Sequence, residues 1–235
     1  TVTFAVNATA GTTYRFRVAG VPLSIDLATG DTPTIAAAAL ASAINANTSL
    51  PVTALAALGV VTITAKNGGT IGNTIQLRGA FDVFAGTTAT ISSPALAGGT
   101  GAVSITAALA ATAAHRYHEH VICLDDSVSG QAARTHVNTQ GAAEVGFGCF
   151  AHQALVGTQS AATTLALALN GDRNTVAAIN GSESWFVAIN AAFAALCARE
   201  EVPNRPLNTE ILTGILPPPV DKRWAPTELR ILLDN

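Results

Sequence analysis

The first hundred residues alternate apolar and polar side chains with the period of two that is typical of β-strands. Thr and Val dominate these stretches, and both favour extended backbone. The pattern therefore predicts a β-rich module whose strands are mainly antiparallel. The segments that show it are residues 2–6, 14–18, 21–27, 61–66 and 75–78.

One helix is expected within this module. The run Asp31-Thr32-Pro33 supplies a capping residue and a proline suited to the first helical turn, and Asn45 and Asn47 mark the end. Apolar side chains recur between these signals at helical spacing, so we expect them to form the buried face. They are Ile35, Ala39, Leu40, Ala43 and Ile44.

The glycine-rich segment 67–73 lies between two predicted strands. A phosphate-binding loop would instead join a strand to the N-terminus of a helix, where the helix dipole and free amides attract an anion. We therefore interpret residues 67–73 as a hairpin turn.

Beyond residue 103 the pattern changes to helices and strands in alternation, with buried strands that carry few polar positions. Such an alternation predicts crossover helices and a parallel α/β sheet. The last helix, capped by Ser184 or a neighbour, buries one apolar face. The predicted strands are 121–124, 145–151 and 175–179. The predicted helices are residues 104–114, one from Ser129, one from Ser160 to Asn170, and one from Ser184 or a neighbour. The apolar face of the Ser184 helix comprises Phe186, Ile189, Phe193, Leu196 and Cys197.

A boundary between two domains is expected at residues 92–101, which are rich in Gly, Ser and Pro. The fold class is thus α+β followed by α/β. We assign residues 1–95 to a β-rich module and residues 102–235 to an α/β domain. Mild proteolysis is expected to cut between Ser92 and Gly101.

Charge is scarce along the whole chain. Charged residues make up 11% of the 235 residues, and the net charge is −3. A surface this weakly charged repels other copies feebly, so it favours a protein that packs against its neighbours. Lys66 and Lys222 are the only lysines, which argues against nucleic-acid binding, and no apolar run is long enough to span a membrane.

Three cysteines, Cys123, Cys149 and Cys197, are far apart in apolar surroundings and lack metal-ligand spacing. We expect them to be buried thiols of a protein made in a reducing compartment. The chain contains no Met and begins within a strand pattern, so we expect it to be a fragment of a longer protein.

The strongest chemical motif is His115, His118 and His120, with Glu119 between them and Asp125-Asp126 nearby. Imidazoles and carboxylates are ligands for zinc or nickel. These histidines straddle a change from helix to strand, which prevents convergence, so we predict no metal site. Asp125-Asp126-Ser127 is expected to cap the next helix.

Neither Gly157-Thr158-Gln159-Ser160 nor Gly181-Ser182-Glu183-Ser184 matches the nucleophile elbow of a serine hydrolase. We therefore predict no catalytic, cofactor-binding or metal-ligating residue, and no cofactor. Two alternatives remain open. One is a metal-dependent hydrolase using His118, His120 and Asp125, and the other is a carbohydrate-binding adhesin module, which the Thr- and Asn-rich first domain favours.

Several motifs of the C-terminal third occur in a characteristic order, and two more occur in the first domain. In the order and spacing of these motifs, the chain resembles the contractile tail sheath proteins of Mu-like, myovirus-type bacteriophages. Leu229 and Arg230 depart from the Glu-Arg-Asn order usual in that family. The motifs are Asp172-Arg173-Asn174-Thr175, an Ala-rich helix ending at Arg199-Glu200-Glu201, residues 204–209, residues 212–218, Ala65-Lys66-Asn67-Gly68 and Ile71-Gly72-Asn73.

The resemblance implies a structural protein of the virion, made in the bacterial host cytoplasm, and not an enzyme. It also implies that residues 1–95 form an outward-facing module and that residues 102–235 form the sheath core domain, incomplete at its C-terminus. Its partners would be other sheath subunits and the tail tube protein. The helical assembly would surround the tube and contract to drive it into the host envelope for viral genome ejection. Terminal segments that exchange strands between neighbours lie outside residues 1–235, so we expect this fragment to be a monomer.

Overall fold

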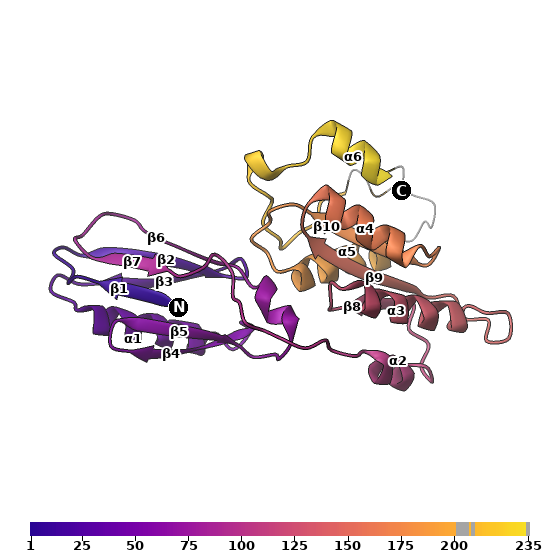
Figure 1. Ribbon diagram of the computed structural model, residues 1–235, viewed down its shortest axis with the longest axis horizontal. Coiled ribbons are helices and arrows are strands. Elements are labelled where there is room, and N and C mark those ends of the chain that lie inside the picture. The colour runs from indigo at the N-terminus through magenta and orange to yellow at the C-terminus, as the bar shows by residue number, and fades with distance from the viewer. Residues whose placement is uncertain (201–206, 208–209, 234–235) are drawn as a thin grey trace. The chain divides into compact units, whose positions relative to one another are not determined.

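The computed structural model describes residues 1–200, 207 and 210–233. The chain divides into two compact units, Thr1–Ala102 and Val103–Asn235 (Figure 1). The content is mixed α and β, with antiparallel sheets in the first unit and a parallel sheet in the second, which confirms the α+β and α/β class. Within the described ranges, no helix is long and apolar enough to cross a membrane.

The first unit contains two antiparallel sheets. One has the strand order β4-β5-β1-β7 and the other β3-β2-β6. The N-terminal strand therefore lies inside its sheet, between strands that come much later in the chain. The strands are β1 (Val2–Ala5), β2 (Thr12–Val18), β3 (Val21–Leu27), β4 (Val52–Ala57), β5 (Val60–Ala65), β6 (Leu77–Phe81) and β7 (Thr88–Ile91).

Alternate residues of these strands form the core between the two sheets. Phe4 of β1 packs edge-on against Tyr14 of β2, with ring centres 5.3 Å apart. Tyr14 is 1% exposed, and its desolvation raises the pKa of its hydroxyl to about 12. Gly79 of β6 makes room for that ring, because a Cβ there would lie 2.0 Å from the Tyr14 hydroxyl.

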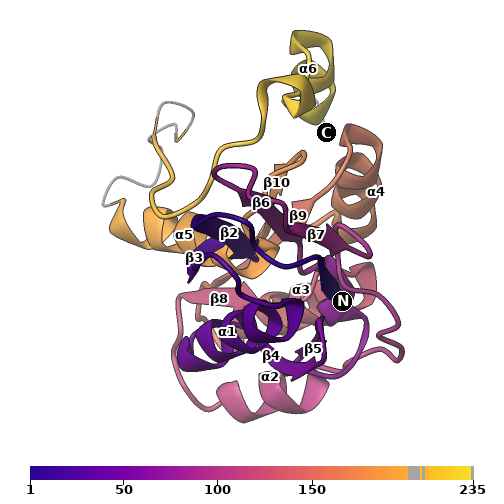
Figure 2. The ribbon, with the colours of Figure 1, turned by 90° about the vertical axis from the view of Figure 1, so that its left-hand side faces the viewer.

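Helix α1 (Pro33–Ala46) runs along β4 and also contacts β3, one strand from each sheet (Figure 2). The predicted start is confirmed, since the Thr32 hydroxyl accepts a hydrogen bond from the Ile35 amide and Pro33 opens the first turn. The predicted face is partly wrong, because Ile35 is 49% exposed. The small alanine side chains let the helix pack closely, and the buried face is rotated about the helix axis from the predicted one. Its buried residues are Ala36, Ala37, Leu40, Ala41 and Ile44.

The hairpin predicted at residues 67–73 is wrong. Strand β5 pairs with β1 and β4, whereas β6 pairs with β2, so the segment between them crosses from one sheet to the other. It contains a 3-10 helix, η1 (Thr70–Thr74). Pairing with distant strands overrides the local turn signal, because each sheet gains a buried face by it.

The Gly-, Ser- and Pro-rich residues 92–101 are held by the first unit. The Leu77 amide donates to the Pro94 carbonyl at 2.8 Å, and the Leu96 amide donates to the Ile75 carbonyl at 3.0 Å. This segment therefore extends the first unit to Ala102, instead of forming a free connector.

The second unit is built on the parallel sheet β10-β9-β8. Its strands are β8 (Glu119–Ile122), β9 (Phe150–Val156) and β10 (Asn174–Ile179). Helices α3 (Ser127–Gln140) and α4 (Gln159–Leu169) are the crossovers between them and contact each other. Helix α5 (Phe186–Arg199) follows β10 and packs on β8 and β9. The remaining helices are α2 (Thr106–Thr112), η2 (Val220–Lys222) and α6 (Pro226–Leu233).

Helices α3 and α5 cover opposite faces of the sheet. The Gln153 amide of β9 donates to the Asp126 carbonyl at the start of α3, whereas the neighbouring His152 ring packs on Phe193 of α5. Successive strand residues point to opposite faces, so the two helices must lie on different sides. The sheet is covered on both faces, as is typical of parallel sheets.

The local signals of the second unit are mostly realised, with two strands displaced. The strand predicted at 121–124 is β8, which runs from Glu119 to Ile122. The strand predicted at 145–151 begins only at Phe150, because Gly146 has φ +65° and turns the chain. Helix α5 begins after Trp185, a neighbour of Ser184. Helix α4 ends at Asn170 in the left-handed conformation, as its Asn-Gly stop predicts. Residues 204–206 and 208–209 of the family motif lie outside the described residues.

Candidate functional site

The parallel register of the second sheet aligns three polar side chains across its three strands. His152 of β9 pairs in register with Thr175 of β10 and with Val121 of β8. Glu119 precedes Val121 by two residues, so it lies on the same face of the sheet. His152 Nε2 contacts Glu119 Oε2, and His152 Nδ1 contacts Thr175 Oγ1. Glu119, His152 and Thr175 thus form one hydrogen-bonded row.

This row has the residue types of a nucleophile, a base and an orienting acid. However, His152 is only 3% exposed, and its ring lies edge-on to Phe193 at 5.6 Å. The Asn190 amide, also from α5, donates to the carbonyls of Ile122 and His152 at 3.0 and 2.7 Å. Helix α5 therefore covers the His152 ring, whereas Glu119 and Thr175 are half-buried, and the row ties the three strands together.

The three histidines of the predicted motif pack on different rings, although the Tyr117 ring lies near both His115 and His120. His115 packs on Tyr117, at 5.8 Å between ring centres, and His118 packs on Phe147 at 4.9 Å. His120 instead lies 5.1 Å from His136 of α3. In the described part of the chain no three His, Cys, Asp or Glu side chains gather closely enough to hold a metal ion.

The two neighbouring aspartates differ in role. Asp126 caps α3 as predicted, because its carboxylate accepts hydrogen bonds from the Ser129 amide and hydroxyl, both at 2.8 Å. Asp125 is partly buried, and desolvation together with the Asp126 charge raises the pKa of its carboxyl. The Gln153 amide occupies the carboxyl end of β8, where it donates to the Leu124 carbonyl at 2.6 Å. Ligands often bind at the carboxyl ends of strands in α/β folds, but at β8 a protein side chain takes that place.

The two serine- and threonine-containing turns have structural roles. Thr158 caps α4, where its hydroxyl accepts from the Ala161 amide at 3.3 Å. Ser182 donates to the Leu216 carbonyl, and Ser184 accepts from the Leu216 amide, both at 2.8 Å. These serines therefore anchor the motif at residues 212–218, in which Gly214 adopts φ +81°.

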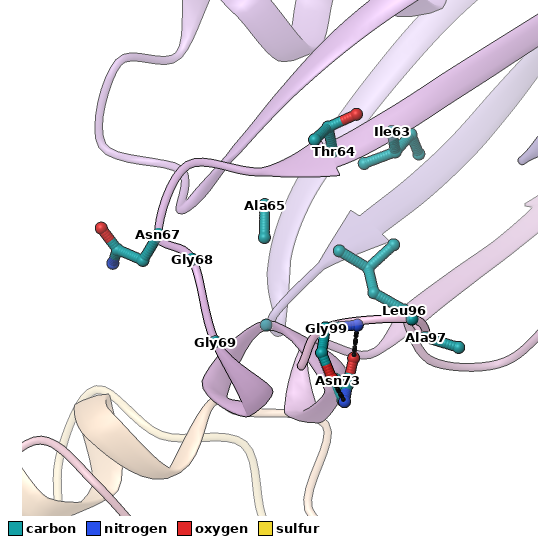
Figure 3. Close-up of a pocket in the computed structure, with 12 residues that line it drawn as sticks. Ile63, Thr64, Ala65, Asn67, Gly68, Gly69, Asn73, Leu96, Ala97 and Gly99 are labelled. Atoms are coloured by element: carbon teal, nitrogen blue, oxygen red, sulfur yellow. Dashed lines mark hydrogen bonds between the residues drawn. The ribbon is translucent and has the colours of Figure 1, made fainter. Parts of the chain in front are cut away.

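A hollow of about 320 Å³ lies in the first unit, where the sheet-crossing segment meets residues 96–99 (Figure 3). The Asn73 amide closes it, accepting from the Gly99 amide at 2.8 Å and donating to the Gly99 carbonyl at 2.9 Å. Its lining contains no charged or aromatic side chain that would bind an ion or stack on a sugar ring. The lining comprises Ile63, Thr64, Ala65, Asn67, Gly68, Gly69, Gly72, Asn73, Leu96, Ala97, Gly98 and Gly99.

The cysteines are free thiols, as expected, but not all are buried. Cys149 is buried, Cys197 is half-buried and Cys123 is exposed. Cys123 follows β8 between buried Ile122 and Leu124, so the alternation turns it outward. Burial raises the pKa of the Cys149 and Cys197 thiols, which lowers their reactivity at neutral pH.

Sequence reasoning did not single out His136 and His152. His136 belongs to the helix that follows β8, and His152 belongs to the next strand, so only the crossover topology brings them near residues 119–120. Two adjacent polar residues, His152 and Gln153, between apolar residues of a strand were the available signal for His152. Comparison with protein-family models and with curated proteins finds no match to this chain.

Proposed function

We propose that this chain is a structural subunit of a contractile phage tail sheath. Copies of it would surround a tail tube and, on contraction, drive the tube into the host envelope. The proposal rests on the resemblance in motif order described above, and three features of the molecule support it.

The open edges of the parallel sheet are the observation that carries the proposal. Among the described residues, β8 and β10 each pair with β9 alone, so each has one unpaired edge. An open edge is a template for a strand from another chain. Linking of sheath subunits by exchanged terminal strands, which the resemblance implies, requires such an edge.

The family motif near the C-terminus forms an anchored turn. Gly214 takes a conformation that favours glycine, and the backbone of Leu216 is bound at both its amide and its carbonyl by two serines of the same unit. Gly214 thus has a structural reason for its identity, which supports the resemblance.

Weak charge also supports assembly. With 11% charged residues and a net charge of −3, copies of the chain repel one another little. In addition, the row of Glu119, His152 and Thr175 has the residue types of a catalytic centre, but its imidazole is buried against α5. These features favour a packing protein over a hydrolase.

Electron microscopy of the protein together with whatever segments its natural chain carries beyond residues 1–235 tests the proposal. We expect tubes or long helical polymers. In these tubes the amides of β8 or β10 should exchange hydrogen more slowly than in the 235-residue chain, whereas those of central β9 serve as an internal control and should change little. A longer protein that stays monomeric under all assembly conditions would contradict the proposal.

A further inference from the structure

Two imidazoles from different elements face each other on the α3 side of the parallel sheet. His120 lies in β8 and His136 lies in the third turn of α3. Their ring centres are 5.1 Å apart, and the ring planes are inclined at 79°. The Tyr117 ring lies 6.2 Å from His120 on another side.

Both rings are only partly exposed, and within the described ranges no hydrogen bond is formed by a ring nitrogen of either. Burial lowers the pKa of both imidazoles, and the nearby His136 lowers that of His120 further. Both rings are therefore mainly neutral at pH 7, and a neutral imidazole has a lone pair available for a metal ion. The nearest carboxylate, Glu119, is bound to His152 on the opposite face.

We propose that His120 and His136 together bind a divalent transition cation of the zinc, nickel and copper group. A metal–nitrogen bond of about 2.1 Å places the centre of each ring roughly 3.2 Å from the ion, and a tetrahedral angle then separates the centres by about 5 Å. The observed separation of 5.1 Å meets this requirement. Water would occupy the remaining coordination positions.

A pair of imidazoles selects among cations by their preference for nitrogen or oxygen ligands. Mg²⁺ and Ca²⁺ prefer oxygen ligands, whereas Cu²⁺, Ni²⁺ and Zn²⁺ bind imidazole nitrogen, with Cu²⁺ the tightest of the three. A cation held by both residues would join β8 to α3, two elements that otherwise meet through few side chains. Bound metal should therefore raise the thermal stability of the second unit.

An edge-to-face packing of two rings gives a similar separation, so the experiment must distinguish ligation from packing. Zn²⁺ is titrated by calorimetry into protein that carries no polyhistidine tag and has been freed of metal with a chelator. We expect saturable one-to-one binding that weakens by about tenfold or more in both His120→Gln and His136→Gln. The matched control His118→Gln, in the same segment, should bind as the parent does.

Electron paramagnetic resonance of the parent protein with one equivalent of Cu²⁺ provides a readout that needs no variant to fold. Two imidazole nitrogens should split the copper signal. Absence of saturable Zn²⁺ binding, binding that survives both substitutions, or loss of binding in His118→Gln would each overturn the proposal.

Discussion

The side-chain amide of Asn73 is paired with the backbone of Gly99 through two hydrogen bonds, one donated and one accepted. The pairing joins the segment that crosses between the two sheets to the segment that leaves the last strand of the first unit. Gly99 fits there because it lacks a side chain, since a Cβ would lie 2.4 Å from the Gly69 carbonyl oxygen. Together with the Thr70 amide, which donates to the Gly101 carbonyl at 3.3 Å, this contact holds the last residues of the first unit.

Asn73→Ala should destabilise the first unit. The substitution removes both hydrogen bonds and leaves a partly buried amide and carbonyl without their partner, which costs about 1–3 kcal/mol. Thermal or urea unfolding of the isolated chain measures the loss. Asn67→Ala is the matched control, because the Asn67 side chain points away from the hollow, and it should leave stability unchanged (Figure 3).

Gly99→Ala should also destabilise the first unit, through a clash with backbone. We expect a loss of roughly 1–3 kcal/mol, as is typical of overpacking. In Gly68→Ala the added methyl group has no neighbour within 4 Å, so this variant should unfold as the parent does. Equal stability of the two variants would show that Gly99 is less confined than its contacts indicate.

Limited proteolysis should first cleave residues 102–105 and not residues 92–101. The latter are tied to the first unit by hydrogen bonds from Leu77 to Pro94 and from Leu96 to Ile75, whereas Ala102, Val103 and Ser104 are exposed and lie outside helices and strands. Mass spectrometry of the first products locates the cut. Early cleavage between Pro94 and Gly99 would contradict this assignment.

Asp125→Asn should stabilise the second unit at neutral pH. Burial raises the pKa of Asp125 above its unfolded value, so the folded state binds more protons and the stability contributed by this group is lost as pH rises through the folded pKa. An amide carries no charge to desolvate. The gain in melting temperature at pH 7 should therefore vanish in strongly acidic solution.

Asp126→Ala is the contrasting variant for the same stretch. It removes the cap of α3 and should lower stability by about 1 kcal/mol at pH 7. Opposite shifts of the two variants would separate the charge of Asp125 from the hydrogen bonds of Asp126. If both variants lower stability equally, burial of the Asp125 charge has no energetic cost.

Local signals in the sequence predict a helix start correctly where nearby residues supply the hydrogen bonds that its first backbone amides need. Thr32 and Pro33 place the start of α1, and Asp126 places the start of α3, because capping involves residues within one turn. The alternation of strands and helices likewise predicts the parallel sheet. The hairpin predicted at 67–73 is wrong because β5 pairs with β4 and with β1, from the other end of the unit, and not with β6.

The chemistry of the histidines was beyond local pattern reasoning for the same reason. The sequence groups His115, His118 and His120 by proximity along the chain, but the fold pairs His120 with His136 and Glu119 with His152. The first contact joins β8 to the crossover helix α3, and the second spans that helix. Packing of α3 on the sheet decides the first, and register between parallel strands decides the second; a sequence read alone specifies neither.

The central position of β1 also determines the order in which the first unit can form during synthesis. Val2 pairs with Val61 on one side and with Ile91 on the other, so both neighbours of this strand leave the ribosome long after it. The hairpin of β2 and β3 and helix α1 can form earlier, from contacts close in sequence. The strand made first is the last to acquire both of its neighbours, and until Ile91 emerges the sheet is incomplete.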